Sequence, residues 1–179
     1  MRNFFKSLLR SLRSDQSGAA SVELVLVFPI FFTVFVSAFE VAMMNARAVM
    51  LERATDIVVR DLRLNASGAD PDYDTILTNV CNLTMMIPDC IQTVKIQMNP
   101  VDQNNWTTMP NEVDCIKRDE DIEPIIQFVN GQENELMLVR VCAVVDPFFP
   151  TVGIGRSMPK DSSGGYIVIA SSAFVNEPN

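Results

Sequence analysis

The sequence predicts an α+β protein in which a long N-terminal helix crosses a membrane and continues into a soluble domain. Three observations predict this fold. Residues 18–44 form an apolar run, apolar residues then recur at helical spacing as far as Leu62, and strand-like runs fill the C-terminal half. A helix followed by antiparallel strands is typical of a helix laid on one face of a sheet. We therefore expect a second helix and an antiparallel sheet of about four strands after the long one.

The apolar run has the length of a transmembrane helix. No charged residue lies between Leu24 and Phe39, and about 20 apolar residues suffice to cross a bilayer. Pro29 lies inside the run and predicts a kink, because proline removes one backbone hydrogen bond. Glu23 is costly at the edge of hydrocarbon, so it is a functional candidate that needs a partner. Glu40 is expected near the far interface, in contact with water and without a special role.

The helical pattern continues beyond the membrane without a glycine or proline before Gly68. Seven residues recur at spacings of three and four and predict one buried stripe: Val41, Met44, Ala48, Leu51, Thr55, Val58 and Leu62. The opposite face carries the charged residues Arg47, Glu52, Asp56, Arg60 and Arg63. One helix from Ala19 to Leu64 would be roughly 69 Å long. The stripe is expected to pack on the protein's own soluble domain, with contacts to partner helices as the alternative.

The remaining chain predicts one helix and four strands. Helical spacing runs from Ile76 to Ile87 and stops at Pro88, whereas residues 99–124 form an acidic surface excursion. The predicted strands are Ile91–Met98, Ile125–Val129, Leu136–Val145 and Tyr166–Val175, with the continuous apolar run Leu136–Val145 as a central, well-covered strand. Residues 151–165 are a Gly/Ser-rich connection. We expect Trp106, Phe148 and Phe149 to be buried in the core, with an exposed partner surface as the alternative.

Composition excludes several function classes. The net charge is −8, yet residues 1–18 hold Arg2, Lys6, Arg10 and Arg13 against one acid, Asp15. This asymmetry predicts a cytoplasmic N-terminus and an exported C-terminal domain. An acidic domain repels phosphates, so we expect no nucleic-acid binding. The chain has no histidine, which removes His-based catalysis and ligation and predicts a protein that is not an enzyme and has no cofactor or metal. Carboxylate-only or Ser-Lys chemistry stays formally open, but a membrane-tethered hydrolase is disfavoured because no G-x-S-x-G nucleophile turn is present. The stretch from Asp70 to Asp74 has the acid spacing of a calcium loop but lacks its glycine and closing glutamate.

Four cysteines, Cys81, Cys90, Cys115 and Cys142, all follow the apolar run. An even number on the exported side predicts two disulfides in an oxidising compartment. Of the three possible connectivities we favour Cys81–Cys90 with Cys115–Cys142, because the first pair closes a short local loop. Four reduced, buried cysteines are the alternative. A zinc site is disfavoured because no pair has the short spacing of a zinc knuckle.

Residues 1–17 alternate basic and apolar residues at near-helical spacing. They are either a cytoplasmic flank that obeys the positive-inside rule or a removable leader resting on the inner leaflet. A secretory signal peptide is a poorer interpretation. The apolar run is too long for one, and its only A-x-A candidate, at residues 46–48, lies within the predicted helix.

A basic leader, then Gly18, then Glu23 five residues on in an apolar helix resembles a type IV prepilin. More narrowly, GAASVELVLVFP at residues 18–29, the continuous helix and the closing AFVNEP at residues 173–178 resemble a TadE/TadF-type minor pilin (pseudopilin) of the tight-adherence, or Flp, pilus system. Leu24 departs from the family's usual aromatic after the glutamate, and Val175 from its frequent arginine. These departures blur whether the chain is TadE-type or TadF-type.

The resemblance implies a processed membrane subunit. Residues 1–18 would be a leader cleaved after Gly18 by a prepilin peptidase, residues 19–64 the pilin-like helix, and residues 65–179 a periplasmic or extracellular domain. The new ammonium of Ala19 would meet the Glu23 carboxylate of a neighbouring subunit. Partners would be the peptidase, other pilins or pseudopilins, and the inner-membrane assembly platform, in pilus assembly or initiation for surface attachment. The alternative is an unprocessed single-pass inner-membrane protein with a periplasmic sensory or binding domain.

Overall fold

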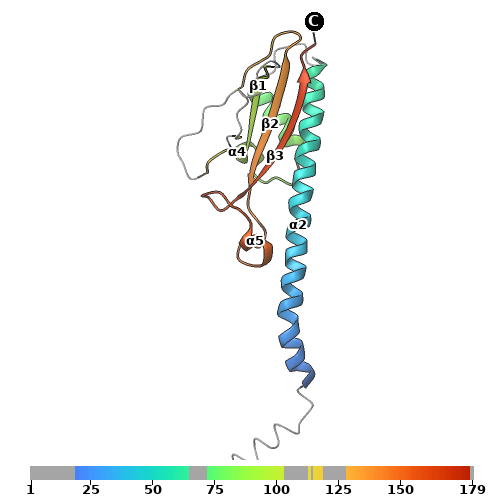
Figure 1. Cartoon of the computed structure of the whole chain (residues 1–179), viewed down its shortest axis with the longest axis vertical. Coiled ribbons are helices and arrows are strands. Elements are labelled where there is room, and N and C mark those ends of the chain that lie inside the picture. Colours follow the sequence, from blue (N-terminus) through green and yellow to red (C-terminus); the bar gives the residue numbers. More distant parts are fainter. Residues whose placement is uncertain (1–18, 65–71, 103–112, 114, 119–127, 178–179) are drawn as a thin grey trace, which may run out of the picture.

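The computed structural model describes residues 19–64, 72–102, 113, 115–118 and 128–177 (Figure 1). A single long helix runs the length of the molecule, and a small domain packs along its C-terminal half. The proposed leader, Trp106 and most of the predicted strand Ile125–Val129 lie outside the described residues. The α+β fold with a long N-terminal helix is confirmed.

Helix α2 spans Ala19–Arg63 without a break, which matches the predicted bounds to within one residue. At about 1.5 Å per residue it is roughly 68 Å long. Pro29 lies inside the helix and does not end it, whereas the kink itself stays a prediction. The two hydroxyls that follow bond back to the helix: Thr33 Oγ1 donates to the Pro29 carbonyl at 2.8 Å, and Ser37 Oγ donates to the Thr33 carbonyl at 2.7 Å. These polar groups are therefore satisfied within an apolar stretch.

The sheet has three antiparallel strands in the order β1-β2-β3, namely Val94–Pro100, Leu136–Val145 and Tyr166–Val175. Val141 of β2 pairs with both Ile96 and Ala170, so β2 is the central strand that its apolar run predicts. The predicted count of four strands is wrong for the described part of the chain. There, Phe128 forms only an isolated bridge to Met98.

Short helical segments replace parts of the predicted strands and loops. Helix α3 spans Tyr73–Leu83 and ends before the predicted Pro88, because the backbone of Thr84 turns to the non-helical angles φ −103° and ψ 74°. Residues Cys90–Thr93 form α4, so β1 starts three residues later than the predicted strand. The predicted connection 151–165 contains a further helix, α5, at Gly153–Ser157.

The core lies between one face of the sheet and the two helices α2 and α3. It collects alternate strand residues and the inner face of each helix: Leu51, Ala54, Val58, Val59, Ile76, Leu77, Val80, Val94, Ile96, Met98, Met137, Val139, Val141, Ala143, Val145, Tyr166, Val168, Ala170 and Phe174. The C-terminal half of the predicted helix stripe is therefore buried in the protein's own domain, as expected.

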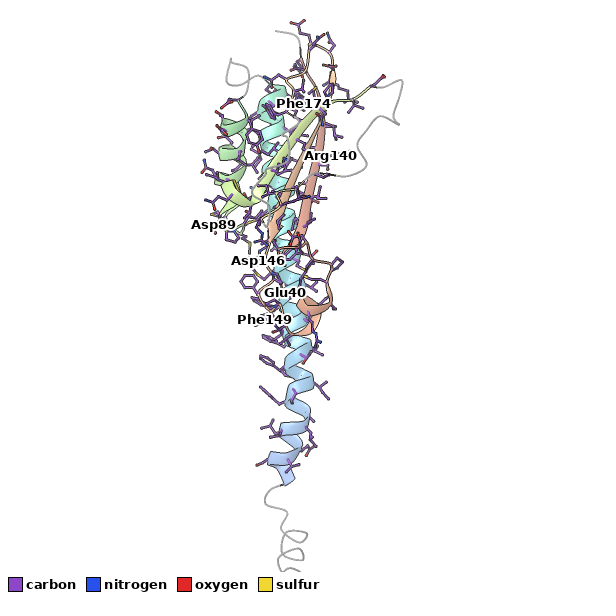
Figure 2. The ribbon with its side chains drawn as sticks, turned by 90° about the vertical axis from the view of Figure 1, so that its left-hand side faces the viewer. Glu40, Asp89, Arg140, Asp146, Phe149 and Phe174 are labelled. Atoms are coloured by element: carbon purple, nitrogen blue, oxygen red, sulfur yellow. A yellow bond between two sulfur atoms is a disulfide. The ribbon has the colours of Figure 1, made fainter. Side chains whose placement is uncertain are left out.

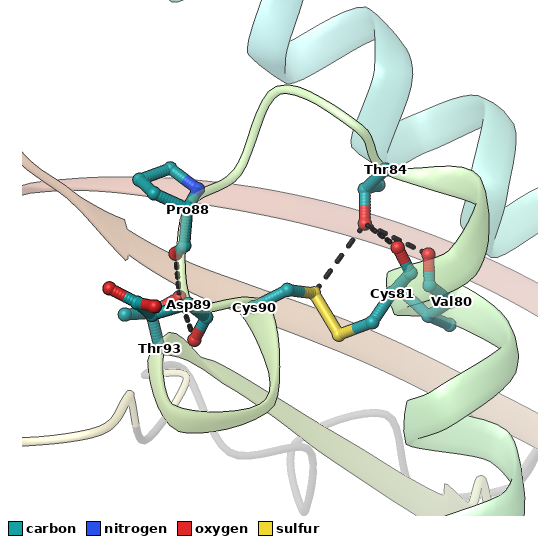
Figure 3. Close-up of a disulfide and its surroundings, with 7 residues drawn as sticks. All are labelled: Val80, Cys81, Thr84, Pro88, Asp89, Cys90 and Thr93. Carbon is teal, nitrogen blue, oxygen red and sulfur yellow. Dashed lines mark hydrogen bonds between the residues drawn. A yellow bond between two sulfur atoms is a disulfide. The ribbon is translucent and has the colours of Figure 1, made fainter.

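Both disulfides favoured from the sequence are present, Cys81–Cys90 and Cys115–Cys142. The first joins the end of α3 to the start of α4 (Figure 3). Thr84 Oγ1 donates to the Val80 carbonyl beside it, and Asp89 adopts a left-handed conformation with φ 49° just before Cys90. The second disulfide ties Cys115 to the outer face of β2. Such bonds persist in oxidising compartments.

Candidate functional site

The N-terminal half of α2 stands clear of the domain. Every residue from Ser21 to Phe35 is exposed, and Val36 is the first buried one. This half contains the long apolar side chains that would be costly in water, and its length and composition are those of a membrane-spanning helix. The molecule therefore divides into a bare apolar rod and a rod segment built into a folded domain (Figure 1).

Glu23 lies exposed on the bare rod. Within the described part of the chain it has no hydrogen bond or ion pair, so any partner for this carboxylate must come from elsewhere. Ala19 is the first residue of α2, and Gly18 lies just outside the described residues. Glu23 lies four residues after Ala19, about one helical turn along α2.

The prediction that Glu40 contacts water is wrong. Glu40 is fully buried, with 0% of its surface exposed. Its two carboxylate oxygens accept hydrogen bonds from the consecutive backbone amides of Phe148 at 3.1 Å and Phe149 at 2.9 Å. Figure 2 shows Glu40 beside Phe149, at the level where the rod enters the domain. The carboxylate therefore holds the loop after β2 onto the helix.

Arg47 is the second charged residue that the sequence misplaces. It was assigned to the solvent face but is only 4% exposed. Its Nη1 donates to the Asp146 carbonyl at 3.0 Å and to the Tyr166 hydroxyl at 2.7 Å, and its guanidinium lies 4.6 Å from the centre of the Phe148 ring. That geometry is a cation–π contact. Arg47 thus ties the end of β2 and the start of β3 to the helix.

The loop 146–158 that these residues hold, which we name the collar, continues down the bare rod. The Ile154 amide donates to Ser37 Oγ at 3.3 Å. Gly153 has φ +58°, and a Cβ there would collide with the Ser37 hydroxyl, so the close approach and the left-handed backbone both require glycine. Phe39 contacts the rings of Phe148 and Phe149 edge to face. The collar therefore contacts α2 from Ser37 to Arg47.

Asp146 starts the collar and pairs with Arg118. Both carboxylate oxygens accept from the guanidinium, at 2.6 Å and 3.0 Å. These hydrogen bonds lower the pKa of the Asp146 carboxyl below its ordinary value of 3.8, against the opposing effect of desolvation. Because the Asp146 side chain is largely exposed, solvent screens the pair and its contribution to stability is small.

The Arg118–Asp146 pair makes stability depend on acid pH. Because the folded-state pKa of Asp146 is lowered, its contribution is present above the ordinary pKa and is lost as the pH falls through the lowered one. Asp146→Asn is expected to lower the free energy of unfolding by about 1 kcal/mol or less at neutral pH and to have no effect well below pH 3.8. Thermal unfolding of both proteins across this range checks it. An equal loss at both ends of the range would contradict the assignment.

The expected hydrophobic burial of Phe148 is wrong. Phe148 is 48% exposed, whereas Phe149 is partly buried and Pro147 is buried. The signal that could have found the collar is the spacing of the buried seam. Val36, Glu40, Arg47, Leu51 and Val58 lie on one helix face, at steps of four and seven. Two residues on this buried face, Glu40 and Arg47, are charged, so a search for apolar residues alone does not find it.

The family model described as TadE-like protein matches residues 18–60. The N-terminal helix is TadE-like. The match begins at Gly18 and covers all but the last three residues of α2, so the resemblance expected from the sequence is confirmed over this segment. Neither a curated protein nor a solved structure matches the chain significantly.

The TadE-like match over the N-terminal helix suggests a protein associated with Tad pili. Together with the candidate membrane span, it indicates a membrane-anchored protein. In the described ranges, no group of three or more carboxylate, cysteine or histidine side chains is placed to hold a metal ion. The candidate site is the bare half of α2 together with the collar, which packs on α2 where that half ends.

Proposed function

We propose that this protein is a minor pilin, or pseudopilin, that is cleaved after Gly18 by a prepilin peptidase and acts in the assembly or initiation of a tight-adherence pilus. The observation that carries the proposal is the bare rod. A TadE-like helix leaves the residues from Ser21 to Phe35 unpacked while its other half is fixed in a domain. A rod of this kind can lie in lipid first and then pack against the rods of other subunits.

Glu23 supports assembly rather than simple anchoring. A plain anchor gains nothing from a carboxylate one turn into its apolar segment, since such a charge is costly in hydrocarbon. Cleavage would create an ammonium on Ala19, and a neighbouring subunit's Glu23 could pair with it. A buried pair of this kind contributes register more than affinity, because leaving one charge unpaired is strongly destabilising.

Orientation follows from charge and disulfides. The basic residues before α2 favour a cytoplasmic N-terminus, and the two disulfides favour an oxidising periplasm for the domain. The partners would be the prepilin peptidase, other pilins or pseudopilins, and the inner-membrane assembly platform. The alternative, an unprocessed single-pass membrane protein with a sensory or binding domain, uses the same anchor and differs in its intact N-terminus.

Deleting the protein from its host tests the proposed role in assembly. Surface pili, counted by electron microscopy, are expected to be lost or strongly reduced, and the wild-type chain supplied in trans should restore them. Unchanged piliation and surface attachment in the deletion strain would contradict the proposal.

A further inference from the structure

If α2 spans a bilayer, the collar contacts α2 at a level that lies within the expected hydrocarbon region. A helix needs about 20 residues, or 30 Å, to cross the hydrocarbon. If the span starts at Ala19 it ends near Phe39, and if Glu23 marks the near interface it ends several residues later. Gly153 and Ile154 contact α2 at Ser37. Ser37 is about 3 Å inside the hydrocarbon if the span starts at Ala19, and deeper if the span starts at Glu23.

The collar presents apolar side chains at this depth. Phe148, Val152 and Ile154 are 48%, 37% and 38% exposed, and Phe39 beside them is 42% exposed. A shallow apolar groove between α2 and α5, lined by Val41, Met44, Ile154 and Met158 among others, adjoins them. In water these surfaces would be unfavourable, whereas at a bilayer interface they would be covered by acyl chains.

The charge of the collar fits a lipid surface. After Asp146, whose carboxylate pairs with Arg118, residues 147–158 of the collar hold no acid and carry one cation, Arg156; Lys160 and Asp161 follow just beyond the collar. Arg156 is exposed in the last turn of α5. Basic residues at this level can meet lipid phosphates while their stems lie along apolar surface.

Four backbone amides of the collar are paired within the protein. The amides of Phe148 and Phe149 bond to Glu40, that of Val152 to the Phe149 carbonyl, and that of Ile154 to Ser37. Pro147 and Pro150 have no amide N–H to satisfy. Lipid-exposed irregular backbone is excluded from the hydrocarbon core, so a collar with these amides paired fits the interface, at the boundary between headgroups and acyl chains.

We propose that the collar inserts into the outer leaflet and forms a second membrane contact beside α2, with Phe148, Val152 and Ile154 among the acyl chains and Arg156 at the phosphates. Two contacts fix the rotation and tilt of the soluble domain on the membrane, which a single helix leaves free. The proposal requires that α2 spans a bilayer with the domain on the outer side, as in the proposed orientation, and it does not depend on cleavage or on a role in pili.

Depth-dependent fluorescence quenching tests the proposal. The full-length protein with Trp106→Phe, which removes the one native tryptophan, would be reconstituted into vesicles of phosphatidylcholine and phosphatidylglycerol with or without acyl-chain bromine. Ile154→Trp is expected to lose most of its emission in the brominated vesicles. Ile169→Trp is the matched control. Ile169 is 46% exposed on β3. It lies three residues beyond Tyr166, which bonds to Arg47, and Arg47 is about 12 Å farther along α2 than Phe39. The control is therefore well outside the expected hydrocarbon.

Two further variants keep the experiment decisive. Phe35→Trp reports the spanning helix and must be quenched, and Val152→Trp repeats the collar measurement should Ile154→Trp fail to fold. Quenching of the collar tryptophans no stronger than that of Ile169→Trp would overturn the proposal. Emission that shifts to the blue without bromine quenching would also overturn it, because the collar would then be covered by protein rather than by lipid.

Discussion

Glu23→Ala is expected to abolish or strongly reduce pilus assembly while leaving the protein folded and inserted in the membrane. Glu23 has no hydrogen-bond or ion-pair partner in the described residues and is exposed on the bare rod, so its loss removes nothing from the folded domain. In an assembled bundle, however, the ammonium of a neighbouring Ala19 would be left unpaired in an apolar setting, which typically costs about 3–5 kcal/mol. Counting surface pili on cells that carry the variant checks the expectation.

Ser21→Ala is the matched control for Glu23→Ala. It removes a small polar group from the same exposed end of the helix and changes no charge, so piliation should stay normal. Membrane fractionation should give equal amounts of both variants. Normal piliation with Glu23→Ala would contradict the pairing role of this carboxylate.

Glu40→Ala is expected to detach the collar and to lower the free energy of unfolding of the domain by about 2–4 kcal/mol. The change leaves the amides of Phe148 and Phe149 without their acceptor, and an unsatisfied buried donor costs about 1–3 kcal/mol. It also leaves a small cavity at a fully buried position. Chemical unfolding in detergent micelles measures the loss, and hydrogen exchange should show the two amides losing protection.

Glu52→Ala provides the control for the loss at Glu40. Glu52 is exposed on the same helix, and the substitution removes the same charge without removing a buried acceptor. Its unfolding free energy should stay within about 0.5 kcal/mol of the wild type. Equal stability of Glu40→Ala and Glu52→Ala, with unchanged exchange at Phe148 and Phe149, would contradict the account of the collar.

Local pattern predicted most of the fold. The bounds of α2 follow from an apolar run and a 3–4 spacing without helix breakers, and β2 and β3 coincide with the predicted runs Leu136–Val145 and Tyr166–Val175. The pairing Cys81–Cys90 follows from a short loop. All of these depend on residues close together in the sequence, and local periodicity reports such features directly.

The collar depends on distant residues and was missed for that reason. Glu40 is 108 residues from Phe148, and Arg47 is 119 residues from Tyr166. The pattern of α2 alone predicts that both charged residues face solvent. Distant backbone amides, a carbonyl, a hydroxyl and an aromatic ring offset the cost of their burial, although Arg47 Nε is buried without a hydrogen-bond partner among the described residues. Helix α5 was missed because a Gly/Ser-rich composition favours a loop, and α5 is a single short turn held by Ser37.

The state of the mature N-terminus tests the central claim most directly. The protein would be purified from cells with and without the prepilin peptidase, with the chain otherwise unchanged, and its N-terminal sequence determined. We predict a chain that begins at Ala19 when the peptidase is present and at Met1 when it is absent. A chain that begins at Met1 in both cells would contradict processing and would leave the protein as an unprocessed membrane anchor.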